Sequence, residues 1–321
     1  MDSIVTYNGI GWRSLIVSIA LSGLGYLAFS LWGGWHDVVD AVVRVGWWGT
    51  ALLLALSATN YVLRFFRWQL YLSALGQTVH WKRSLVIYLA GFALTTTPGK
   101  AGEMVRGVFL KPLGLGYGPS VAAFISERLS DLLAIVLLAC LGLSRYPFAW
   151  PLIVAGAGAV IVLLVLLNQE RLLEQLDERA CRRSGRMSAV YRKVLRMFID
   201  ARRCHRPKVF LFATPLSVVA WTAEAYAFHL MLGWLGLQVD ITFAFFVYAV
   251  AMLAGALSFL PGGLGGVEAT MVALLLWAGQ PQAAAVAATV LIRLTTLWFA
   301  VALGLVALGG LLRGRSAMAA D

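Results

Sequence analysis

The stretch LTTTPGKAGEMVRG, residues 94–107, interrupts an apolar region with a Pro-Gly pair, a second glycine and several ionisable side chains. A second stretch, LSFLPGGLGGVEAT at residues 257–270, interrupts another apolar region in nearly the same way. Because proline and glycine end or restart helices, each stretch predicts a broken helix. An acid follows each break, Glu103 in the first and Glu268 in the second. The segments around these breaks decide the fold.

The composition is that of an integral membrane protein. Of the 321 residues, 60% are hydrophobic and 13% are charged, and the mean hydropathy is +0.81. A soluble domain carries about 25% charged residues, and a membrane-spanning helix needs about 20 apolar ones. We therefore predict an all-α membrane protein, a single membrane domain over residues 1–321, with apolar segments at 14–34, 46–66, 83–97, 101–111, 119–143, 150–167, 209–234, 241–260, 263–279 and 283–311.

The segments that flank the breaks are unusual. Residues 83–97 and 101–111 are each too short to cross a bilayer. Two short helices that meet at a Pro-Gly turn predict a re-entrant hairpin, which enters and leaves on one side. Residues 241–260 and 263–279 form the second predicted hairpin. Non-helical backbone at membrane depth is tolerated only where protein or a water-lined cavity covers it.

The distribution of positive charge predicts the topology. Residues 168–208 hold 12 Lys/Arg against five Asp/Glu, which indicates a basic cytoplasmic linker and argues against nucleic-acid binding. Arg64 and Arg67 are interpreted as markers of a cytoplasmic loop before the first hairpin. With 14–34 as a retained first span, both termini are cytoplasmic, six helices cross fully, and two hairpins do not. Within the linker, residues 186–206 predict an amphipathic helix on the inner leaflet, with an apolar side made of Met187, Val190, Val194, Met197, Phe198 and Ala201. A basic loop that only sets the topology is the alternative.

The two breaks predict an inverted repeat, in which residues 46–143 recur upside down as 209–311. PGKAGE at 98–103 aligns with PGGLGGVE at 261–268, which carries two extra residues before its acid. Arg128 lies 30 residues after Pro98 and Arg293 lies 32 after Pro261, which is the same offset once the insertion is counted. Inverted repeats with broken helices at their interface recur in transporters.

These motifs resemble the membrane domain of the lysylphosphatidylglycerol synthase/flippase family, also met as stand-alone membrane proteins. The resemblance rests on PGKAGEMVRGVFL (98–110), SERLSDLL (126–133) and PGGLGGVEATMVALLL (261–276), and it covers most of residues 46–310. It implies movement of a lipid with a charged or sugar headgroup between leaflets. Relatives that also synthesise aminoacylated lipid carry a large soluble domain, for which the linker here is too short.

Ionisable groups in apolar segments make up the candidate site. A charge at the bilayer centre costs at least ~2.5–3.5 kcal/mol, so such groups persist only when paired or facing a polar cavity. A helix N-terminus favours anions, and glycine lets a ligand approach the backbone. We predict that both breaks expose unpaired backbone donors and that arginines join them to bind a lipid phosphate. The predicted substrate-binding residues are Pro98, Gly99, Lys100, Gly102, Glu103, Arg106, Glu127, Arg128, Asp131, Pro261, Gly262, Gly263, Glu268 and Arg293.

Structural alternatives exist for several of these residues. Glu103 and Glu268 could simply cap their half-helices, and Arg128 could form a structural ion pair with Glu127 or Asp131. Arg293 has no acid within four residues and therefore requires a distant partner or a ligand. Glu224, which has His229 five residues on, suits a proton-carrying or helix-packing role and not a metal site.

The leading hypothesis is a lipid flippase of the bacterial cytoplasmic (inner) membrane that takes an anionic or phosphate-bearing lipid and needs no cofactor or metal. The phosphate-bearing lipid could be aminoacylated, glycosylated or polyprenyl-linked. An intramembrane lipid-modifying enzyme with Glu103 or Glu268 as base is one alternative, and a scaffold of an envelope pathway is another. The sequence leaves the headgroup, the direction of transport, any ion coupling and the oligomeric state open.

Overall fold

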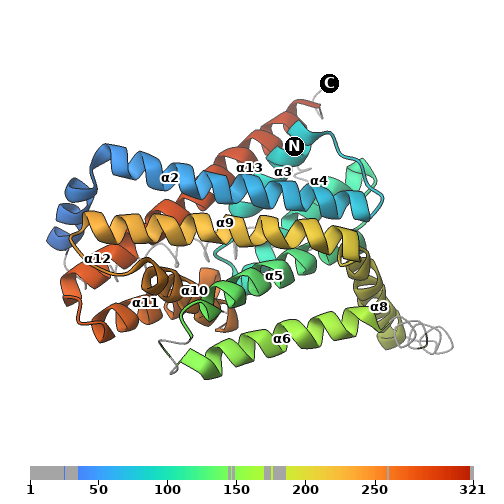
Figure 1. The fold of residues 1–321 in the computed structure, drawn as a ribbon. Helices are drawn as coiled ribbons and strands as arrows, with labels where there is room; N and C mark the ends of the chain where they lie inside the picture. The colour runs from blue at the N-terminus through green and yellow to red at the C-terminus, as the bar shows by residue number, and fades with distance from the viewer. Residues whose placement is uncertain are drawn as a thin grey trace.

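A computed structural model describes residues 35–143, 149–169, 186–258 and 260–318, together with Gly25, Tyr146 and Gln175. The predicted first span at 14–34 (Gly25 apart) and much of the basic linker lie outside these described residues. Every regular element in the described part is helical (Figure 1), which confirms the predicted all-α class. The elements are α2 (Trp35–Ala74), α3 (Trp81–Phe92), η1 (Pro98–Val105), α4 (Arg106–Leu110), η2 (Lys111–Leu113), α5 (Tyr117–Cys140), α6 (Trp150–Asn168), α8 (Arg186–Cys204), α9 (Pro207–Trp234), α10 (Ile241–Leu257), η4 (Pro261–Gly263), α11 (Gly266–Trp277), α12 (Gln282–Arg293), η5 (Leu294–Trp298) and α13 (Phe299–Met318).

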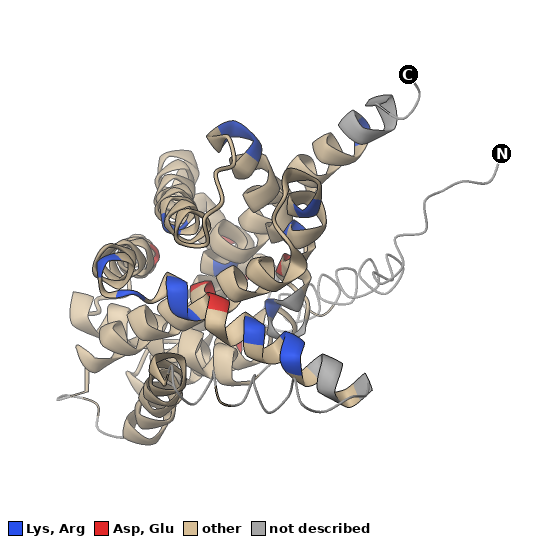
Figure 2. Cartoon of the chain, turned by 90° about the vertical axis from the view of Figure 1, so that its right-hand side faces the viewer, with Lys and Arg blue, Asp and Glu red and all other residues tan. Residues whose placement is uncertain are grey.

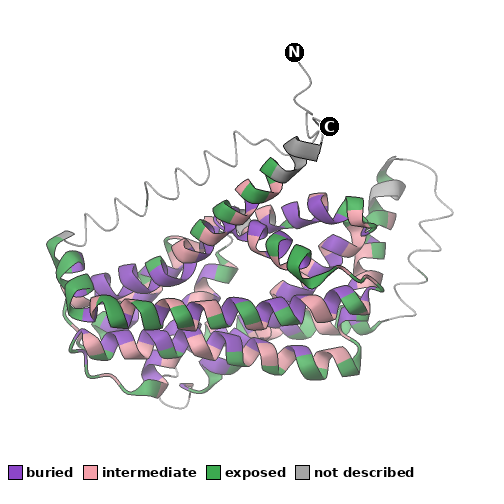
Figure 3. Cartoon of the chain, turned by 90° about the horizontal axis from the view of Figure 1, so that it is seen from above, coloured by how far each residue is buried: buried purple, intermediate pink, exposed green. Residues whose placement is uncertain are grey.

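The helices have the lengths and surfaces of a multi-pass membrane protein. In the described residues, four stretches are long and apolar enough to cross a bilayer, namely α2, α6, α9 and the continuous run α12–η5–α13. Large apolar side chains stand on the outer faces, such as Trp48 at 71% exposure and Val306 at 77%. Figure 3 shows these exposed positions along the outside and the buried ones between the helices. Such a surface suits lipid and not water.

Helices α2 and α9 form an extensive helix pair along one face of the molecule. They lie side by side along most of their length and run in opposite directions (Figure 1). Helix α3, which precedes the first break, packs against α13, and α10, which precedes the second, packs against α5. In the same way α9 contacts α5, and α2 contacts α12. The segments that hold the two Pro-Gly breaks, η1 and η4, touch each other.

Close helix packing relies on a small residue where α3 meets α13. A Cβ atom on Gly304 would lie 2.1 Å from the backbone nitrogen of Ala93, so no larger residue fits without moving a helix. Because lipid is as apolar as leucine, such close backbone contact is a main source of helix association in membranes. The first broken segment is therefore held against the last helix of the chain.

The buried apolar side chains of the described residues form two main clusters. One draws on α2, α5, α6, α9, α10, α11 and α12, and includes Phe228, Phe246 and Met271. The other draws mainly on α2, α3, α4 and α13, and includes Tyr71 and Phe92. Helix α2 therefore contributes to both clusters.

Two sequence interpretations need correction. Arg64 and Arg67 do not lie in a loop: both are inside α2, at 5% and 0% exposure, because Asp131 accepts hydrogen bonds from both. The first predicted half-helix is mostly a 3-10 segment, η1, and becomes α-helical only at Arg106. The predicted helix of the linker is present as α8, and its contact with the inner leaflet stays a prediction.

Candidate functional site

The first break carries a buried ion-pair network. Arg106, at the start of α4, donates to Glu103 Oε2 at 2.5 Å and to Glu127 Oε2 of α5 at 2.6 Å. Its guanidinium also lies over the rings of Tyr88 and Trp68, at 4.5 and 5.1 Å from their centroids. Cation–π contact of this kind stabilises a desolvated cation. The network therefore ties η1, α4, α3 and α5 into one unit.

Asp131 is the hub of a second part of this network. Its carboxylate accepts hydrogen bonds from Arg64 at 3.0 Å and Arg67 at 2.7 Å, both from α2. Trp221 Nε1 of α9 donates to it at 3.1 Å, and Arg128 lies 3.1 Å away. Arg128 also reaches Glu103 at 3.4 Å, which joins the two parts. The structural pairing predicted for Arg128 is therefore with Asp131 and Glu103, while Glu127 pairs with Arg106.

Lys100 differs from every other cation of this region. It lies in η1 with a φ of +56°, which makes it the one residue other than glycine with a left-handed backbone in the described chain. Holding such a conformation costs on the order of 1–3 kcal/mol, and residues held this way cluster at functional sites. No acid in the described residues lies within ion-pair distance of its ammonium group. Lys100 is thus a strained cation without a salt-bridge partner among the described residues.

The second break contains a closed pair. Arg293, the last residue of α12, donates through Nε to Glu268 Oε1 at 2.7 Å and through Nη2 to the carbonyl of Gly262 at 2.8 Å. Glu268 Oε2 accepts from the backbone N–H of Gly265 at 2.7 Å and so caps α11. The distant partner that Arg293 requires is therefore Glu268, 25 residues away. The capping alternative for Glu268 is confirmed at the same time.

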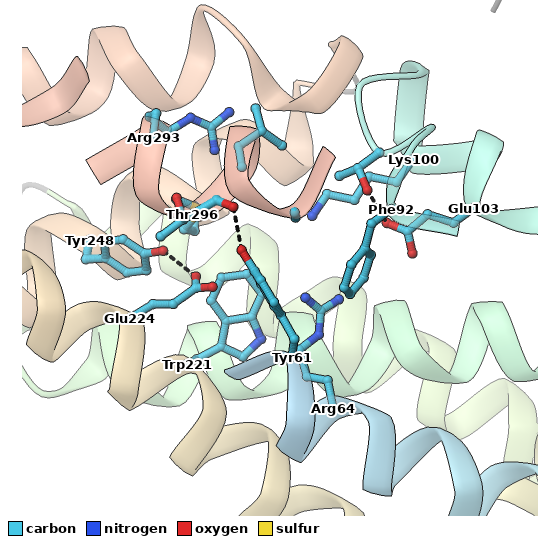
Figure 4. Close-up of a pocket in the computed structure, with 14 residues that line it drawn as sticks. Tyr61, Arg64, Phe92, Lys100, Glu103, Trp221, Glu224, Tyr248, Arg293 and Thr296 are labelled. Atoms are coloured by element: carbon cyan, nitrogen blue, oxygen red, sulfur yellow. Dashed lines mark hydrogen bonds between the residues drawn. The ribbon is translucent and has the colours of Figure 1, made fainter. Parts of the chain in front are cut away.

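A small cavity lies beside the first break (Figure 4). Arg293, which donates to the carbonyl of Gly262 in the second break, also lines it. The volume of the cavity is about 50 Å³. Since one water takes roughly 10–15 Å³ on this measure, it has room for a few waters or a phosphate group and none for acyl chains. Its lining comes from α2, α3, η1, α9, α10, α12, η5 and α13, and includes Tyr61, Arg64, Phe92, Thr95, Lys100, Glu103, Trp221, Glu224, Tyr248, Arg293 and Thr296.

One wall of the cavity is a π-helical turn, η5, directly after Arg293. A π-turn departs from regular α-helical hydrogen bonding and is frequent at functional sites. The carbonyl of Thr296 in this turn accepts a hydrogen bond from Tyr61 Oη at 2.5 Å. The contact fixes a phenol ring of α2 across the cavity, against the last run of helix.

Glu224 faces the same cavity from α9. It is 5% exposed, and its carboxylate Oε2 accepts a hydrogen bond from Tyr248 Oη of α10 at 2.5 Å. No Lys or Arg in the described chain forms a salt bridge with it. Figure 4 shows the Lys100 and Glu224 side chains reaching toward the cavity from opposite sides. Among the described residues that line the cavity, one cation, Lys100, and one acid, Glu224, thus form no salt bridge.

The interior charges do not balance. In the described chain, the ionisable side chains of the two breaks and their network, Glu224 included, number eleven. Five are buried acids and six are cations, of which Lys100 and Arg128 are only partly buried, so the excess is one positive charge: Arg64, Arg67, Lys100, Arg106, Arg128 and Arg293 against Glu103, Glu127, Asp131, Glu224 and Glu268. In addition, the Nε groups of Arg64, Arg67 and Arg106 have no hydrogen-bond partner in the described part of the protein. An uncompensated charge in a low-dielectric interior is expensive, so this region favours an added anion.

The predicted residues fall into three groups. Lys100, Glu103, Glu224 and Arg293 line the cavity itself. A second group supports it from behind: Arg106, Glu127, Arg128, Asp131 and Glu268. Pro98, Gly99 and Gly102 belong to η1, and Pro261, Gly262 and Gly263 to η4, where they shape the backbone of the breaks. A Cβ on Gly262 would lie 3.4 Å from Thr96 Cα, so the two breaks meet closely.

The prediction that the breaks present unpaired backbone donors is wrong at several positions. The N–H of Gly102 donates to Thr97 Oγ1 at 2.6 Å, and that of Gly265 to Glu268. The N–H groups of Lys100 and Gly263 bond to the carbonyls of Thr97 and Leu260. The protein satisfies these donors itself because a buried amide without a partner is costly. Side-chain cations are therefore the groups left to receive an anion.

Several lining residues were absent from the sequence prediction. They are Tyr61 and Arg64 of α2, Trp221 of α9, Tyr248 of α10 and Thr296 of η5. Arg64 carried a usable signal, since an Arg inside an apolar run indicates a buried partner. The tyrosines and the threonine carried none, because such residues are common in membrane helices.

No metal site is present in the part of the chain that the structure describes, since no three His, Cys, Asp or Glu side chains lie together there in a way that could hold an ion.

Comparison with known proteins places these residues in a family. The family model described as the lysylphosphatidylglycerol synthase TM region matches residues 15–304. Two UPF0104 membrane proteins of Methanothermobacter thermautotrophicus are similar, at 26% identity over 80% of this chain and 84% of theirs, and at 24% over 89% and 90%. A UPF0104 membrane protein of Pyrococcus horikoshii is 23% identical over 85% of this chain and 90% of its own.

Proposed function

The chain belongs to the lysylphosphatidylglycerol synthase transmembrane-region family, as its motifs predicted, and on this premise we propose that it moves a phosphate-bearing lipid between the leaflets of a membrane. Such a lipid could be aminoacylated, glycosylated or polyprenyl-linked. The observation that carries the proposal is the cavity with an unpaired Lys100, enclosed in an interior with excess positive charge. The bilayer holds the acyl chains, and only the headgroup has to enter.

The helix contacts support an inverted repeat of residues 46–143 and 209–311. In this repeat α2 corresponds to α9, α3 to α10, and α5 to the run α12–η5–α13. The contact of α3 with α13 then corresponds to that of α10 with α5, and the contact of α2 with α12 to that of α9 with α5. The pair of α2 and α9 runs antiparallel, as the inversion requires. In this proposal six helices cross the membrane and the two broken segments are re-entrant hairpins. Rocking of one half against the other would expose the cavity to each leaflet in turn.

The ends of the helices differ in charge, which supports an orientation. Figure 2 shows Lys and Arg gathered at the end of the molecule that carries α8. At the other end, the pocket beside the start of α2 is lined by Asp37 and Asp40 with Arg44. By the positive-inside rule the α8 end would face the cytoplasm. The end of α13 lies on the same side of the molecule (Figure 1), which supports the predicted cytoplasmic C-terminus. The proposed membrane is a cytoplasmic membrane, the inner one in a bacterium.

The test is lipid exchange by the purified protein in vesicles. We would reconstitute it in phosphatidylcholine vesicles with a trace of fluorescent phosphatidylglycerol or phosphatidic acid, and measure how fast the inner-leaflet probe becomes reducible by external dithionite. The wild type should accelerate this exchange. Lys100→Ala should slow it by about tenfold to a hundredfold, the effect of losing one charged hydrogen bond worth ~1.5–3 kcal/mol.

Arg83→Ala is the matched control, because Arg83 is an exposed cation at the start of α3, outside the cavity. It should leave the exchange rate unchanged. Equal exchange in vesicles with and without wild-type protein would refute the proposal. Mass spectrometry of the recovered lipids addresses the enzyme alternative, since a new lipid species would identify a modifying enzyme and an unchanged composition a transporter.

A further inference from the structure

Glu224 is the one acid of the interior without a cationic partner in the described chain. Each of the other four acids forms a salt bridge, Glu103 and Glu127 with Arg106, Asp131 with Arg64, and Glu268 with Arg293. Glu224 Oε2 accepts from Tyr248, and no hydrogen bond to Oε1 occurs in the described chain. A carboxylate with a free oxygen at a cavity wall can take up a proton without breaking an ion pair.

The surroundings of Glu224 contain charged and titratable groups from each neighbouring element that lines the cavity. These are Tyr61 and Arg64 on α2, Tyr248 on α10, Arg293 on α12, and Lys100 and Glu103 on η1. On α5, Asp131 receives the hydrogen bond of Trp221, one turn before Glu224, and Arg128 lies beside Asp131. Arg64, Arg128 and Arg293 already hold acids. Of the cations that line the cavity, Lys100 is therefore the one without an ion-pair partner in the described chain, and it faces Glu224 across the space that a headgroup would occupy.

A charge balance then separates two kinds of headgroup. With all groups ionised, the interior has one positive charge in excess, as counted above. A phosphodiester headgroup brings one negative charge and neutralises it. A phosphomonoester that brings two negative charges leaves one negative in excess, unless Glu224 becomes neutral. Because uncompensated charge is strongly disfavoured in a low-dielectric interior, each headgroup selects a different state of Glu224.

We propose that Glu224 binds one proton when a dianionic phosphomonoester lipid enters the cavity, and stays ionised when a monoanionic phosphodiester lipid enters. The proton comes from cavity water, forms an O–H bond at the free carboxylate oxygen, and leaves when the headgroup leaves. Transport of a phosphomonoester lipid is then coupled to a proton, and transport of a phosphodiester lipid is not. This inference rests on the proposed transport function and adds its regulation by pH.

The experiment compares two probes in the same vesicles at a series of pH values. Fluorescent phosphatidic acid is the phosphomonoester and fluorescent phosphatidylglycerol the phosphodiester. With wild-type protein, exchange of phosphatidic acid should fall on the alkaline side by up to about tenfold per pH unit, as loss of one required proton demands. Exchange of phosphatidylglycerol should stay constant over the same range.

Glu224→Gln separates the protein's proton from that of the lipid. The amide resembles the protonated acid, so the rate of phosphatidic acid exchange by this variant should decrease much less at alkaline pH than the wild-type rate. Titration of the lipid itself affects both proteins equally. Tyr248→Phe is the second variant, should Glu224→Gln fail to fold. It removes the donor that favours the ionised carboxylate. The alkaline decrease in the rate of phosphatidic acid exchange should therefore occur at higher pH in Tyr248→Phe than in the wild type.

The outcomes are distinct. Suppose that the wild type moves both lipids and that Glu224→Gln shows the wild-type pH profile for phosphatidic acid. The inference is then overturned while the transport function stands, and Tyr248→Phe serves the same purpose if Glu224→Gln does not fold. If the wild type moves neither lipid, both the inference and the transport function are refuted. The inference is supported if the pH profile of phosphatidic acid exchange becomes flat in Glu224→Gln and the pH profile of phosphatidylglycerol exchange is flat in both proteins.

Discussion

The two Pro-Gly breaks resemble each other in sequence and differ in what surrounds them. In the first, Lys100 occupies the position of Gly263 in the second, and both have a left-handed backbone, at φ of +56° and +69°. Glu103 of the first forms salt bridges with Arg106 and Arg128, whereas in the described chain Glu268 of the second forms one with Arg293 alone. The second also bends at Gly262 and Gly265, with φ of +63° and +84°.

This difference indicates that the two breaks have different roles. Glycine adopts the left-handed conformation at no steric cost, so the second break makes its turn without strain. The first break places a lysine in the same conformation, which costs conformational free energy. This cost is explained if the left-handed backbone is what directs the ammonium group toward the cavity. The second break provides shape and a neutral closed pair, and the first provides the positive charge.

The largest expected effect is at the hub of the first network. Asp131→Asn leaves Arg64, Arg67 and Arg128 without their shared counter-ion. Removing one partner of a buried pair typically costs about 3–5 kcal/mol, so we expect a large loss of stability or no folded protein. Thermal melting in detergent, followed by tryptophan fluorescence, measures it. A melting temperature equal to that of the wild type would show that the network does not hold the fold.

A smaller loss is expected at the second break. In Glu268→Gln the amide oxygen can still accept one hydrogen bond, and Arg293 keeps its bond to the carbonyl of Gly262. The loss should therefore be that of one charged hydrogen bond, about 1.5–3 kcal/mol. The same melting experiment, run beside Asp131→Asn, ranks the two breaks. The comparison drawn here fails if Glu268→Gln is the more damaging change.

Substitution of a glycine should destabilise the two breaks for different reasons. A Cβ on Gly102 would lie 2.7 Å from the carbonyl oxygen of Leu94, a clash with backbone, so Gly102→Ala should lose about 1–3 kcal/mol by overpacking. A Cβ on Gly265 meets nothing nearer than 3.8 Å, but its φ of +84° is unfavourable for alanine. Gly265→Asn, which tolerates positive φ better than alanine, should therefore melt at a higher temperature than Gly265→Ala.

At Gly102, where the obstacle is space and not φ, Asn should be no better tolerated than Ala. Equal melting of Gly265→Asn and Gly265→Ala would contradict backbone strain as the cause at the second break.

The smallest effect on stability, and the most informative, is expected at Lys100. Lys100→Gly gives the first break the residue that the second already has. Relief of the left-handed strain, of about 1–2 kcal/mol, is partly offset by the greater freedom of glycine in the unfolded chain, so the variant should melt at or slightly above the wild-type temperature. Lipid exchange should nevertheless fall as in Lys100→Ala. A clear drop in melting temperature would mean that Lys100 supports the fold.

Much of the architecture was predictable because it depends on local composition. Apolar runs predicted the helices, and the observed α9 and α6 end within about two residues of the predicted segments. The family followed from PGKAGE, SERLSDLL and PGGLGGVE, and the comparison confirmed it. The partner of Arg293 was predicted to be distant, though not which residue it was. The first break was harder, because Thr97 supports a 3-10 segment in place of a regular half-helix.

By itself the sequence determined the membrane class, the two breaks and the set of ionisable residues that the membrane forces to pair or to line a cavity. Only the tertiary structure decided the pairing, because Asp131, Arg64 and Trp221 come from three helices far apart in the chain. It alone left Lys100 and Glu224 facing one cavity without salt-bridge partners in the described chain. The physical reason is that hydropathy depends on each residue separately, whereas the energy of a buried charge depends on the other charges that the packed helices bring near it.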